Sequence, residues 1–396
     1  MNKALNPSAE LASAIGTAPN LASGLSQTTP LAFVENFSTQ NSVHTLVGPI
    51  TRAHFITPTP HQTKPQENFS LKYKEYKTAS EATLEAALKQ AEPANLLEQM
   101  RYVLSNGGKR VRPVLTMLAC GAVGGNPFYA AMGGVVIEVL HNFTLVHDDI
   151  MDEAPLRRGL PTIHTKWNCS TAILSGDAMM AFAYKLLLKH YALNPRFIEC
   201  ADLVTRAILE VCEGQVSDME FQDRAEVSMP EYITMIEKKT ARMLELCATL
   251  GTVLGNGSAR ELAALKTFAR SIGIAFQILD DVLDATATAP EFGKTLGGDI
   301  IEGKKTFLVV HALENRHALS ASDNALLEEF IDNKGLPRER VSEMVHFFER
   351  NHALEAARDA VELYTKRAHQ ALETLPAGEH RTMLHQFSTM LLQRCS

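Results

Sequence analysis

Residues 147–164 read HDDIMDEAPLRRGLPTIH, and residues 277–284 read QILDDVLD. Both stretches contain the pattern Asp-Asp-x-x-Asp. On a helix with about 3.6 residues per turn, the first and last Asp of this pattern share one face, and the middle Asp stands beside them. Carboxylates crowded in this way repel one another unless a cation lies among them, and Mg²⁺ accepts such oxygen ligands while keeping water and phosphate in its shell. The two stretches therefore predict a polyphosphate held between metal ions.

An apolar helical stripe leads into each acidic pattern. Val135, Val139, Phe143 and Val146 recur at helical spacing before the first pattern, and a similar stripe over residues 262–279 precedes the second. We find no alternating segment of useful length for a strand and no repeat of fixed period. We therefore predict an all-α fold, a helical bundle whose core is lined from facing helices.

A single Asp-Asp-x-x-Asp would be weak evidence, because solvated helix faces often carry three acids. Such acids are usually interleaved with basic partners at i+4. Here they are embedded among apolar residues, namely Ile150, Met151, Leu279, Val282 and Leu283. The duplication in this setting favours metal binding over a solvated face.

Composition narrows the class of protein. The formal net charge of -7 argues against nucleic-acid binding, which needs a basic surface. The six cysteines are irregularly spaced and form no Cys-x-x-Cys pair, so we expect no zinc site or disulfide scaffold and a reducing compartment. No uninterrupted apolar run reaches the roughly 18 residues needed to cross a bilayer. We expect a soluble, cytoplasmic protein without a transmembrane segment.

The composition of the chain changes after about residue 66. Residues 1–66 are rich in Ser, Thr, Ala, Asn and Pro and contain only two acids, Glu10 and Glu35. We expect this extension to be disordered or processed, and organellar import stays open if it is a transit peptide, although Arg52 is its only arginine. We expect residues 67–396 to form the folded domain, with amphipathic helical spacing in residues 82–104.

Basic residues gather beside the acids. The stretch GGKRVRP at residues 107–113 puts cations on a glycine turn, and Arg157 and Arg158 follow the first acidic pattern. Further lysines follow glycines at Lys294 and Lys304. Arginine binds phosphate oxygens in pairs and lysine supplies a point charge, so we expect one diphosphate held through metal and another held directly by cations. Residues 298–305 nearly match a nucleotide-binding loop, but Lys305 stands where that loop needs a hydroxyl.

Together these motifs resemble those of the trans-isoprenyl diphosphate synthases, or polyprenyl synthetases. The resemblance covers roughly residues 84–313 and is carried by GGKRVRP at 107–113, LVHDDIMDEAPLRRGLPTIH at 145–164, KKT at 238–240, FQILDDVLD at 276–284, GKTLGGD at 293–299 and EGKKT at 302–306. It implies the all-helical isoprenoid synthase fold around a deep central cavity, usually in a homodimer. It also implies condensation of isopentenyl diphosphate with an allylic diphosphate.

The resemblance implies a role for each matching residue. About three Mg²⁺ ions would be held on the allylic diphosphate by Asp148, Asp149, Asp152, Asp280, Asp281 and Asp284. That diphosphate would also contact Arg157, Lys239 and Lys294. Isopentenyl diphosphate would be bound by Lys109, Arg112, His141 and Arg158. Thr240 and Gln277 would line the reacting carbon, and Lys304 would help close the site.

Product length would depend on the helix before the first Asp. In the family that the sequence resembles, bulk one to two turns before this Asp closes the floor of the cavity, and here those positions are Phe143 and Thr144. At about 1.5 Å per residue, Phe143 lies roughly 7.5 Å up the helix from Asp148. The bulk of Phe143 predicts that chain growth ends there, and the smaller Thr144 leaves space beside it. We therefore expect geranylgeranyl diphosphate as the product, with farnesyl diphosphate as the alternative. The alternative role of Phe143 is plain core packing.

Two other functions are compatible with the same fold. A terpene synthase would ionise a prenyl diphosphate and cyclise it, but it would not need the second set of cations. A non-catalytic partner subunit should have lost acidic-motif residues, and none is missing here. Both alternatives are therefore less favoured than prenyl transfer.

Overall fold

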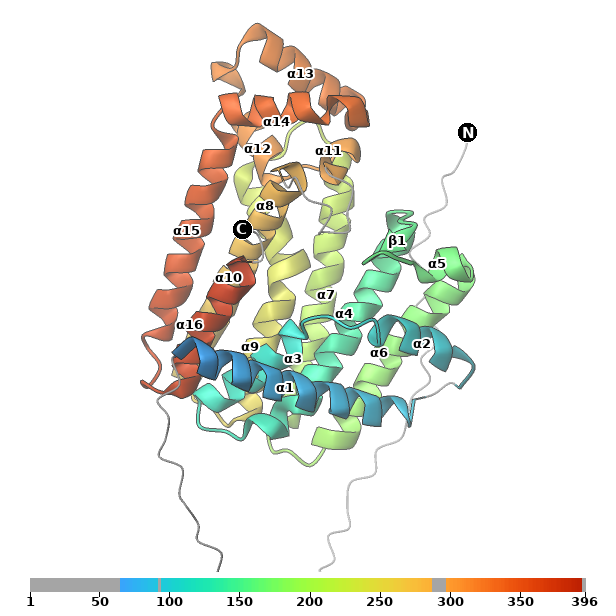
Figure 1. The fold of residues 1–396 in the computed structure, drawn as a ribbon, viewed down its shortest axis with the longest axis vertical. Helices are drawn as coiled ribbons and strands as arrows, with labels where there is room; N and C mark the ends of the chain where they lie inside the picture. The colour runs from blue at the N-terminus through green and yellow to red at the C-terminus, as the bar shows by residue number, and fades with distance from the viewer. Residues whose placement is uncertain (1–64, 92–93, 287–296, 394–396) are drawn as a thin grey trace, which may run out of the picture. The chain divides into compact units, whose positions relative to one another are not determined.

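The computed structural model describes residues 65–91, 94–286 and 297–393, and Figure 1 shows how its elements are arranged. The first half contains α1 (Pro65–Leu88), η1 (Ala94–Leu96), α2 (Leu97–Leu104), α3 (Val111–Ala122), η2 (Pro127–Ala130), α4 (Ala131–Met151), β1 (Leu156–Arg157), β2 (Leu160–Pro161), α5 (Ile163–Lys166), α6 (Cys169–Tyr191) and α7 (Phe197–Gln222). The second half contains α8 (Met229–Ile236), η3 (Glu237–Ala241), α9 (Arg242–Leu254), α10 (Ala259–Thr286), α11 (Gly298–Ile301), α12 (Phe307–Glu314), η5 (Arg316–Ala318), α13 (Ala321–Asp332), η6 (Arg338–Arg340), α14 (Val341–Arg350), α15 (Ala353–Leu372) and α16 (Glu379–Leu392).

The predicted all-α fold is confirmed. Within the described residues, the strands form a single antiparallel hairpin in which Leu156 pairs with Pro161 and Arg157 with Leu160. This hairpin directly follows the first acidic pattern. It turns the chain back so that Arg157 returns toward the carboxylates of α4.

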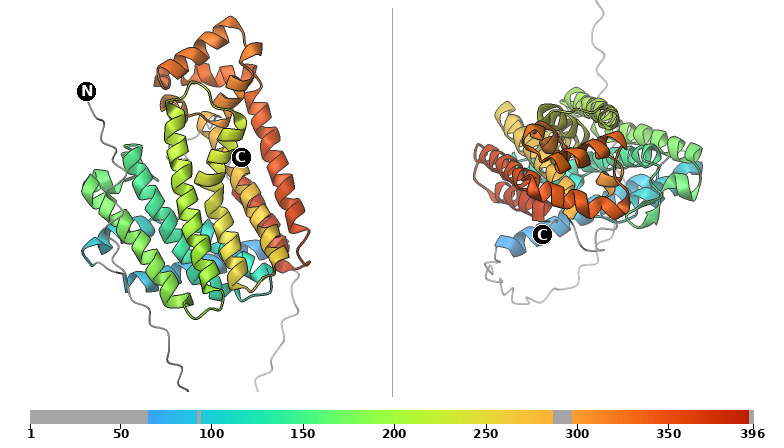
Figure 2. Two further views of the ribbon diagram at one scale, coloured as in Figure 1. Left: turned by 180° about the vertical axis from the view of Figure 1, so that it is seen from behind. Right: turned by 90° about the horizontal axis from the view of Figure 1, so that it is seen from above.

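Two clusters of buried apolar side chains stabilise the bundle. The first is built mainly from α1, α3, α4, α6 and α9, and the second from α8, α12, α14 and the start of α15. The long helix α10 contributes to both, with Leu265 and Phe268 in the first cluster and Ile278 and Val282 in the second. Figure 2 shows α7, α9 and α10 running side by side, and the contacts of α9 with both neighbours agree.

Local signals account for several helix boundaries. A capping box at Ser228 starts α8: Glu231 accepts a hydrogen bond from the backbone N–H of Ser228 at 2.9 Å, and the helix begins at the next residue. The helical spacing expected over residues 82–104 is divided between α1, which ends at Leu88, and α2, which begins at Leu97. Helix α1 begins at Pro65, and the predicted extension before it lies outside the described residues.

Three described segments are long and apolar enough to cross a membrane by length and composition alone: Pro127–Met151, Cys169–Tyr191 and Ala259–Thr286. This differs from the sequence prediction, which looked for an uninterrupted apolar run. Polar residues interrupt these helices without lowering their mean hydropathy below that of a spanning segment. Inside the bundle, 72%, 50% and 56% of their apolar windows are buried, so core packing accounts for much of their composition.

Candidate active site

The first acidic motif lies at the C-terminal end of α4. Asp148 and Asp149 occupy the last turn, and Asp152 caps it with its N–H bonded to the Asp148 carbonyl. Asp149 is buried and accepts a hydrogen bond from Nε of Arg157 at 2.5 Å, whereas Asp148 is more exposed and lies 3.9 Å from the same guanidinium. Burial raises the pKa of Asp149, against the opposing effect of Arg157. The motif therefore consists of two accessible carboxylates and one that is anchored by arginine.

The second acidic motif lies near the C-terminal end of α10. Asp281 is only 5% exposed, and its Oδ2 accepts hydrogen bonds from the Tyr232 hydroxyl at 2.6 Å and the Phe307 N–H at 2.9 Å. Its Oδ1 accepts a third, from Nε2 of Gln277, at 3.0 Å. Burial raises the pKa of Asp281 to about 7, and the nearby charge of Asp299 adds to this effect. These partners favour a positioning role for Asp281, and its role as a metal ligand stays a prediction.

The other two acids of this motif are partly exposed. Oδ2 of Asp284 accepts a hydrogen bond from the Asp299 N–H at 2.9 Å, which joins the end of α10 to the start of α11. Asp280 lies on the same stretch of α10 and is half-buried. Asp280 and Asp284, one helical turn apart, are the members of this motif with access to a bound ion.

A chain of polar contacts joins the two motifs. Nζ of Lys239 lies 3.9 Å from Oδ1 of Asp148 and donates to Oδ2 of Asp218 on α7 at 2.5 Å. The next residue, Thr240, donates its hydroxyl to Oε1 of Gln277 at 2.7 Å, and Gln277 in turn bonds Asp281. The structure thus brings Lys239, Thr240 and Gln277 together between the motifs, and their roles toward the substrates stay predictions.

Lys304 interacts with carboxylates from both acidic regions of the site. Its Nζ lies 2.7 Å from Glu302 and 3.7 Å from Asp299. Burial alone would lower the pKa of Lys304, but the charges of Asp299 and Asp152 raise it. Lys304 is therefore a fixed cation that faces carboxylates of both halves. The other predicted lysine of this region, Lys294, lies outside the described residues.

The second set of predicted cations gathers around His141 on α4. Burial lowers the pKa of His141 well below 6.5, and the charges of Arg112, Arg158 and Arg157 lower it further. Arg158 stands at the turn of the hairpin with a φ of 54°, and its guanidinium approaches Gly108, where an added Cβ would lie 3.5 Å away. Arg112 and Arg158 beside a neutral histidine favour a site for an anion, and Arg157, which bonds Asp149, links this cluster to the carboxylates of α4.

Arg110 belongs to the same basic stretch but has a different role. Its guanidinium is buried, bonds Glu138 on α4 at 2.9 Å and donates to the Leu104 carbonyl at 2.6 Å. Tyr73 holds the neighbouring turn by donating to the Lys109 carbonyl at 2.6 Å. Arg110 therefore anchors the turn that presents Lys109 and Arg112.

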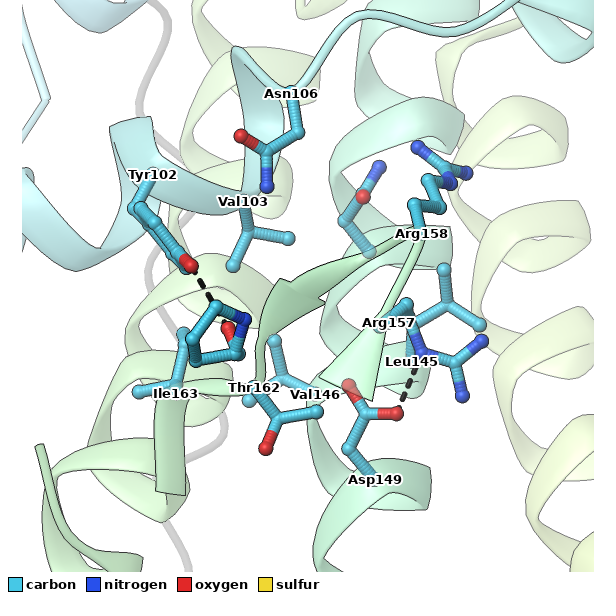
Figure 3. A pocket seen from close by; sticks show the side chains of 12 residues that line it. Tyr102, Val103, Asn106, Leu145, Val146, Asp149, Arg157, Arg158, Thr162 and Ile163 are labelled. Carbon is cyan, nitrogen blue, oxygen red and sulfur yellow. Dashed lines mark hydrogen bonds and ion pairs between the residues drawn. The ribbon is translucent and has the colours of Figure 1, made fainter. Parts of the chain in front are cut away.

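A pocket of about 30 Å³ lies between α2, α4 and the hairpin. Figure 3 shows Asp149 and Arg157 at one side of it and Tyr102 at the other, where the Tyr102 hydroxyl donates to the Pro161 carbonyl at 2.8 Å. A space of this size holds one or two water molecules. It is therefore a supporting cavity behind the hairpin arginines.

The two residues predicted to limit product length lie where α4 meets α6. Phe143 is 7% exposed and contacts the ring of His147 edge-on, with 5.0 Å between the ring centroids. His147 in turn approaches the Ile173 carbonyl at 3.2 Å and lies over Gly176 of α6. Thr144 is half-buried and donates to the His141 carbonyl at 2.8 Å. Phe143 is therefore buried against His147, and its role in product length stays a prediction.

Several residues of the site were not singled out from sequence. Asp218 bonds Lys239, Tyr232 bonds Asp281, and Asp299 acts on Lys304. Asp218 stands between Glu213 and Glu220 on one helix and Asp299 follows two glycines, so both had a weak signal. Tyr232 had none, because a tyrosine on an apolar helical stripe is indistinguishable from ordinary core.

The residue types fit divalent metal ions, which prefer hard oxygen ligands. Among the described residues, no three His, Cys, Asp or Glu side chains converge closely enough to hold an ion by themselves. A donor set of one or two carboxylates per ion matches Mg²⁺, which keeps several waters and substrate oxygens in its shell. The accessible acids Asp148, Asp152, Asp280 and Asp284 would supply these carboxylates.

Comparison with known proteins gives consistent matches. The family model described as polyprenyl synthetase matches residues 93–347. The short chain isoprenyl diphosphate synthase of Methanothermobacter thermautotrophicus is 36% identical over 322 residues, which cover 81% of this chain and 97% of that protein. The geranylgeranyl diphosphate synthase of Methanosarcina mazei is 41% identical over 251 residues, or 63% of this chain and 78% of that protein. The crystal structure of geranylgeranyl pyrophosphate synthetase from Pyrococcus horikoshii superposes with a TM-score of 0.75 at 33% identity, covering 83% of this chain and 99% of that one.

Proposed function

Because the chain belongs to the polyprenyl synthetase family and is a trans-prenyltransferase, we propose that it condenses isopentenyl diphosphate with an allylic diphosphate and forms geranylgeranyl diphosphate. The observation that carries this proposal is the pairing of two anion sites. One lies among the carboxylates of α4 and α10 with Lys239 between them, and the other lies among the arginines around His141. A condensation of two diphosphates needs both.

The chemistry follows from charge. An allylic carbon–oxygen bond ionises only when the negative charge on the leaving diphosphate is stabilised. Divalent metal ions, when bound at the acidic motifs, would supply most of that stabilisation; about three Mg²⁺ are expected. Arg157, Lys239 and Lys304 would add fixed positive charge to the same diphosphate. Each of these three cations is held near the acidic motifs by a carboxylate partner in the structure.

The second substrate would be oriented by the cations around His141. Lys109, Arg112 and Arg158 would hold its diphosphate, and the lowered pKa of His141 keeps its ring neutral so that it can hydrogen-bond without adding charge. The alkene of isopentenyl diphosphate would then attack the allylic cation beside Thr240 and Gln277. Loss of a proton, accepted by the released diphosphate, completes the new bond. Exclusion of water from the site would protect the cation.

Product length would be set on α4. Phe143 is buried and wedged against His147, which supports a rigid stop below the first motif, and Thr144 is small enough to leave room for a chain longer than farnesyl. The names of the relatives are consistent with this length. Incubation of the wild type and of Phe143→Ala with labelled isopentenyl diphosphate tests the assignment. Geranylgeranyl diphosphate from the wild type and longer products from the variant are expected; unchanged length in the variant would show that Phe143 does not limit product length.

A terpene synthase on the same fold makes a different prediction. Such an enzyme would release hydrocarbon from a prenyl diphosphate without isopentenyl diphosphate. We expect no hydrocarbon in that assay, and diphosphate release that requires both substrates. A protein that released no diphosphate with Mg²⁺ and both substrates would instead fit a non-catalytic subunit.

Large apolar side chains on the outer faces of α6 and α7 support a homodimer. They are Ile173, Leu174, Leu188, Ile198, Leu209, Val216 and Met219, each at least 44% exposed in the single chain. Large apolar side chains that are exposed along two helices of one chain favour burial in an interface. Light scattering should give the mass of two chains, and Leu209→Glu should lower it. A monomeric wild type would contradict the assignment.

A further inference from the structure

Lys239 and Thr240, which the proposed function places beside the substrates, lie on an unusual turn of helix. Residues 237–241 form a π-helical turn, η3, between α8 and α9, in which the N–H of Arg242 bonds the carbonyl of Glu237. Such turns are rare and contain one residue more than the α-helical turn that they replace. Because consecutive side chains on an α-helix are about 100° apart, a wider turn brings two neighbours closer to the same side. The turn thus helps Lys239 and Thr240 to face one site.

Two glycines make room for this turn. A Cβ added to Gly214 of α7 would lie 2.4 Å from the Lys239 nitrogen, and one added to Gly273 of α10 would lie 2.5 Å from Cα of Ala241. The backbones of α7 and α10 therefore touch the turn from two sides. This close approach fixes where the turn lies but not its internal shape.

An arginine on α10 spans the turn. Arg270 lies 3.1 Å through Nη1 from Glu237, the first residue of the turn, and donates through Nε to Glu245 at 2.7 Å, one helical turn after it. Glu245 is 2% exposed and is also paired with Arg242, which in turn reaches Glu210 of α7 at 2.9 Å. A helix rises about 1.5 Å per residue, and a wider turn advances less per residue. One guanidinium that holds both carboxylates therefore favours the shortened, π-helical form of the segment.

We propose that Arg270 is a positioning residue, which keeps the turn of residues 237–241 in its π-helical form through Glu237 and so holds Lys239 and Thr240 toward the substrates. The inference rests on the proposed function of this site. Arg270 acts without touching a substrate. Its loss should lower turnover through misplacement of Thr240 and not through weaker binding of isopentenyl diphosphate, which is held elsewhere.

Glu237→Ala is the sharpest test, because Glu237 is one-third exposed and its loss leaves buried Glu245 with Arg270 and Arg242. Glu85→Ala is the matched control: its ion pair with Arg101 also joins two helices, at 3.2 Å, with an arginine of nearly the same exposure and a more exposed glutamate, far from the site in sequence. We expect Glu237→Ala to lower kcat by about tenfold, with the KM for isopentenyl diphosphate unchanged, and the control to behave as wild type. In a Thr240→Val background the further loss from Glu237→Ala should be much smaller. An unchanged kcat, or the same fold-loss in the Thr240→Val background, would overturn the proposal.

A second measurement does not depend on turnover. Hydrogen exchange of the metal-free proteins should be faster at the amides of residues 239–242 in Glu237→Ala than in wild type, and unchanged there in Glu85→Ala. Equal protection in all three proteins would overturn the positioning role even if prenyl transfer is confirmed. Faster exchange in Glu237→Ala, in a protein that shows no prenyl transfer, would support the role of Arg270 in holding the turn. It would refute only the proposed function.

Discussion

Alanine substitutions in the acidic motifs should separate into two kinds, as Asp148 and Asp281 illustrate. Asp281 accepts hydrogen bonds from Tyr232, Phe307 and Gln277 in a site where the carboxylate is 5% exposed. Asp281→Ala leaves the Tyr232 hydroxyl and the Phe307 N–H buried without partners, at about 1–3 kcal/mol each. Because the pKa of Asp281 is raised to about 7, removal of the carboxyl also relieves a burial cost. We therefore expect a net loss of roughly 2–4 kcal/mol in the free energy of unfolding.

Asp148→Ala should behave differently. Asp148 is more exposed and its two cations lie at 3.9 Å, while the pKa of Asp152 is raised by burial and further by the charge of Asp148. Its removal should change the free energy of unfolding by no more than about 0.5 kcal/mol. Turnover should nevertheless fall by orders of magnitude, since a metal ligand is lost.

Thermal unfolding followed by circular dichroism in the presence of a chelator measures the first effect, and diphosphate release with both substrates measures the second. Both variants should be nearly inactive, but only Asp281→Ala should melt several degrees below wild type. If Asp281→Ala melted with wild type, or if Asp148→Ala were the less stable variant, the division into anchored and accessible carboxylates would be refuted. Near-normal turnover in Asp148→Ala would contradict the two-motif site itself.

Three further predictions concern the packing, the pH dependence and the metal. Gly176→Ala would put a Cβ 2.2 Å from Nε2 of His147, so α6 should shift and the protein lose about 1–3 kcal/mol of stability, seen as a lower melting temperature; an unchanged melt would refute the close packing. The pKa of His141 is lowered in the folded protein, so the unfolded chain takes up the proton first and stability should fall as pH drops below 6.5; His141→Asn should flatten this part of the profile, and an unaltered slope would exclude His141 as its source. Removal of divalent metal with a chelator should abolish diphosphate release and Mg²⁺ should restore it, with Asp148→Ala needing more Mg²⁺ than wild type; turnover in the chelated enzyme would contradict metal-assisted ionisation.

The sequence predicts the site best where residues of one chemical type recur at a spacing that places them together. The two acidic patterns and the basic stretch GGKRVRP are recognisable from residue type alone, because carboxylates and arginines embedded among apolar residues are unusual. Residue type does not tell which member of a motif is accessible and which is enclosed. Asp280 and Asp281 are neighbours with the same side chain, yet only contacts from α8 and α12 reveal that Asp281 is enclosed.

Residue type also does not distinguish the roles of Arg110 and Arg112, and it gives no sign of the turn that carries Lys239. Arg110 and Arg112 are two residues apart on one basic stretch, but Arg110 turns inward to Glu138. The π-helical turn that carries Lys239 and Thr240 had no sequence signal, since its residues Glu-Lys-Lys-Thr-Ala are ordinary helix formers. Its position depends on the glycines of α7 and α10 and on Arg270, all distant in sequence.

The sequence by itself determined that this chain is helical and that it resembles the polyprenyl synthetases. It also determined that two acidic helix ends and a basic turn supply the charged residues of the predicted site. These properties are local, since they follow from hydrophobic period, charge and spacing. Only the tertiary structure decided which carboxylates remain accessible, how Lys239, Thr240 and Gln277 link the two motifs, and which arginines serve the fold instead of the substrates. Those outcomes depend on burial and on partners from other helices, and neither can be read from neighbouring residues in the chain.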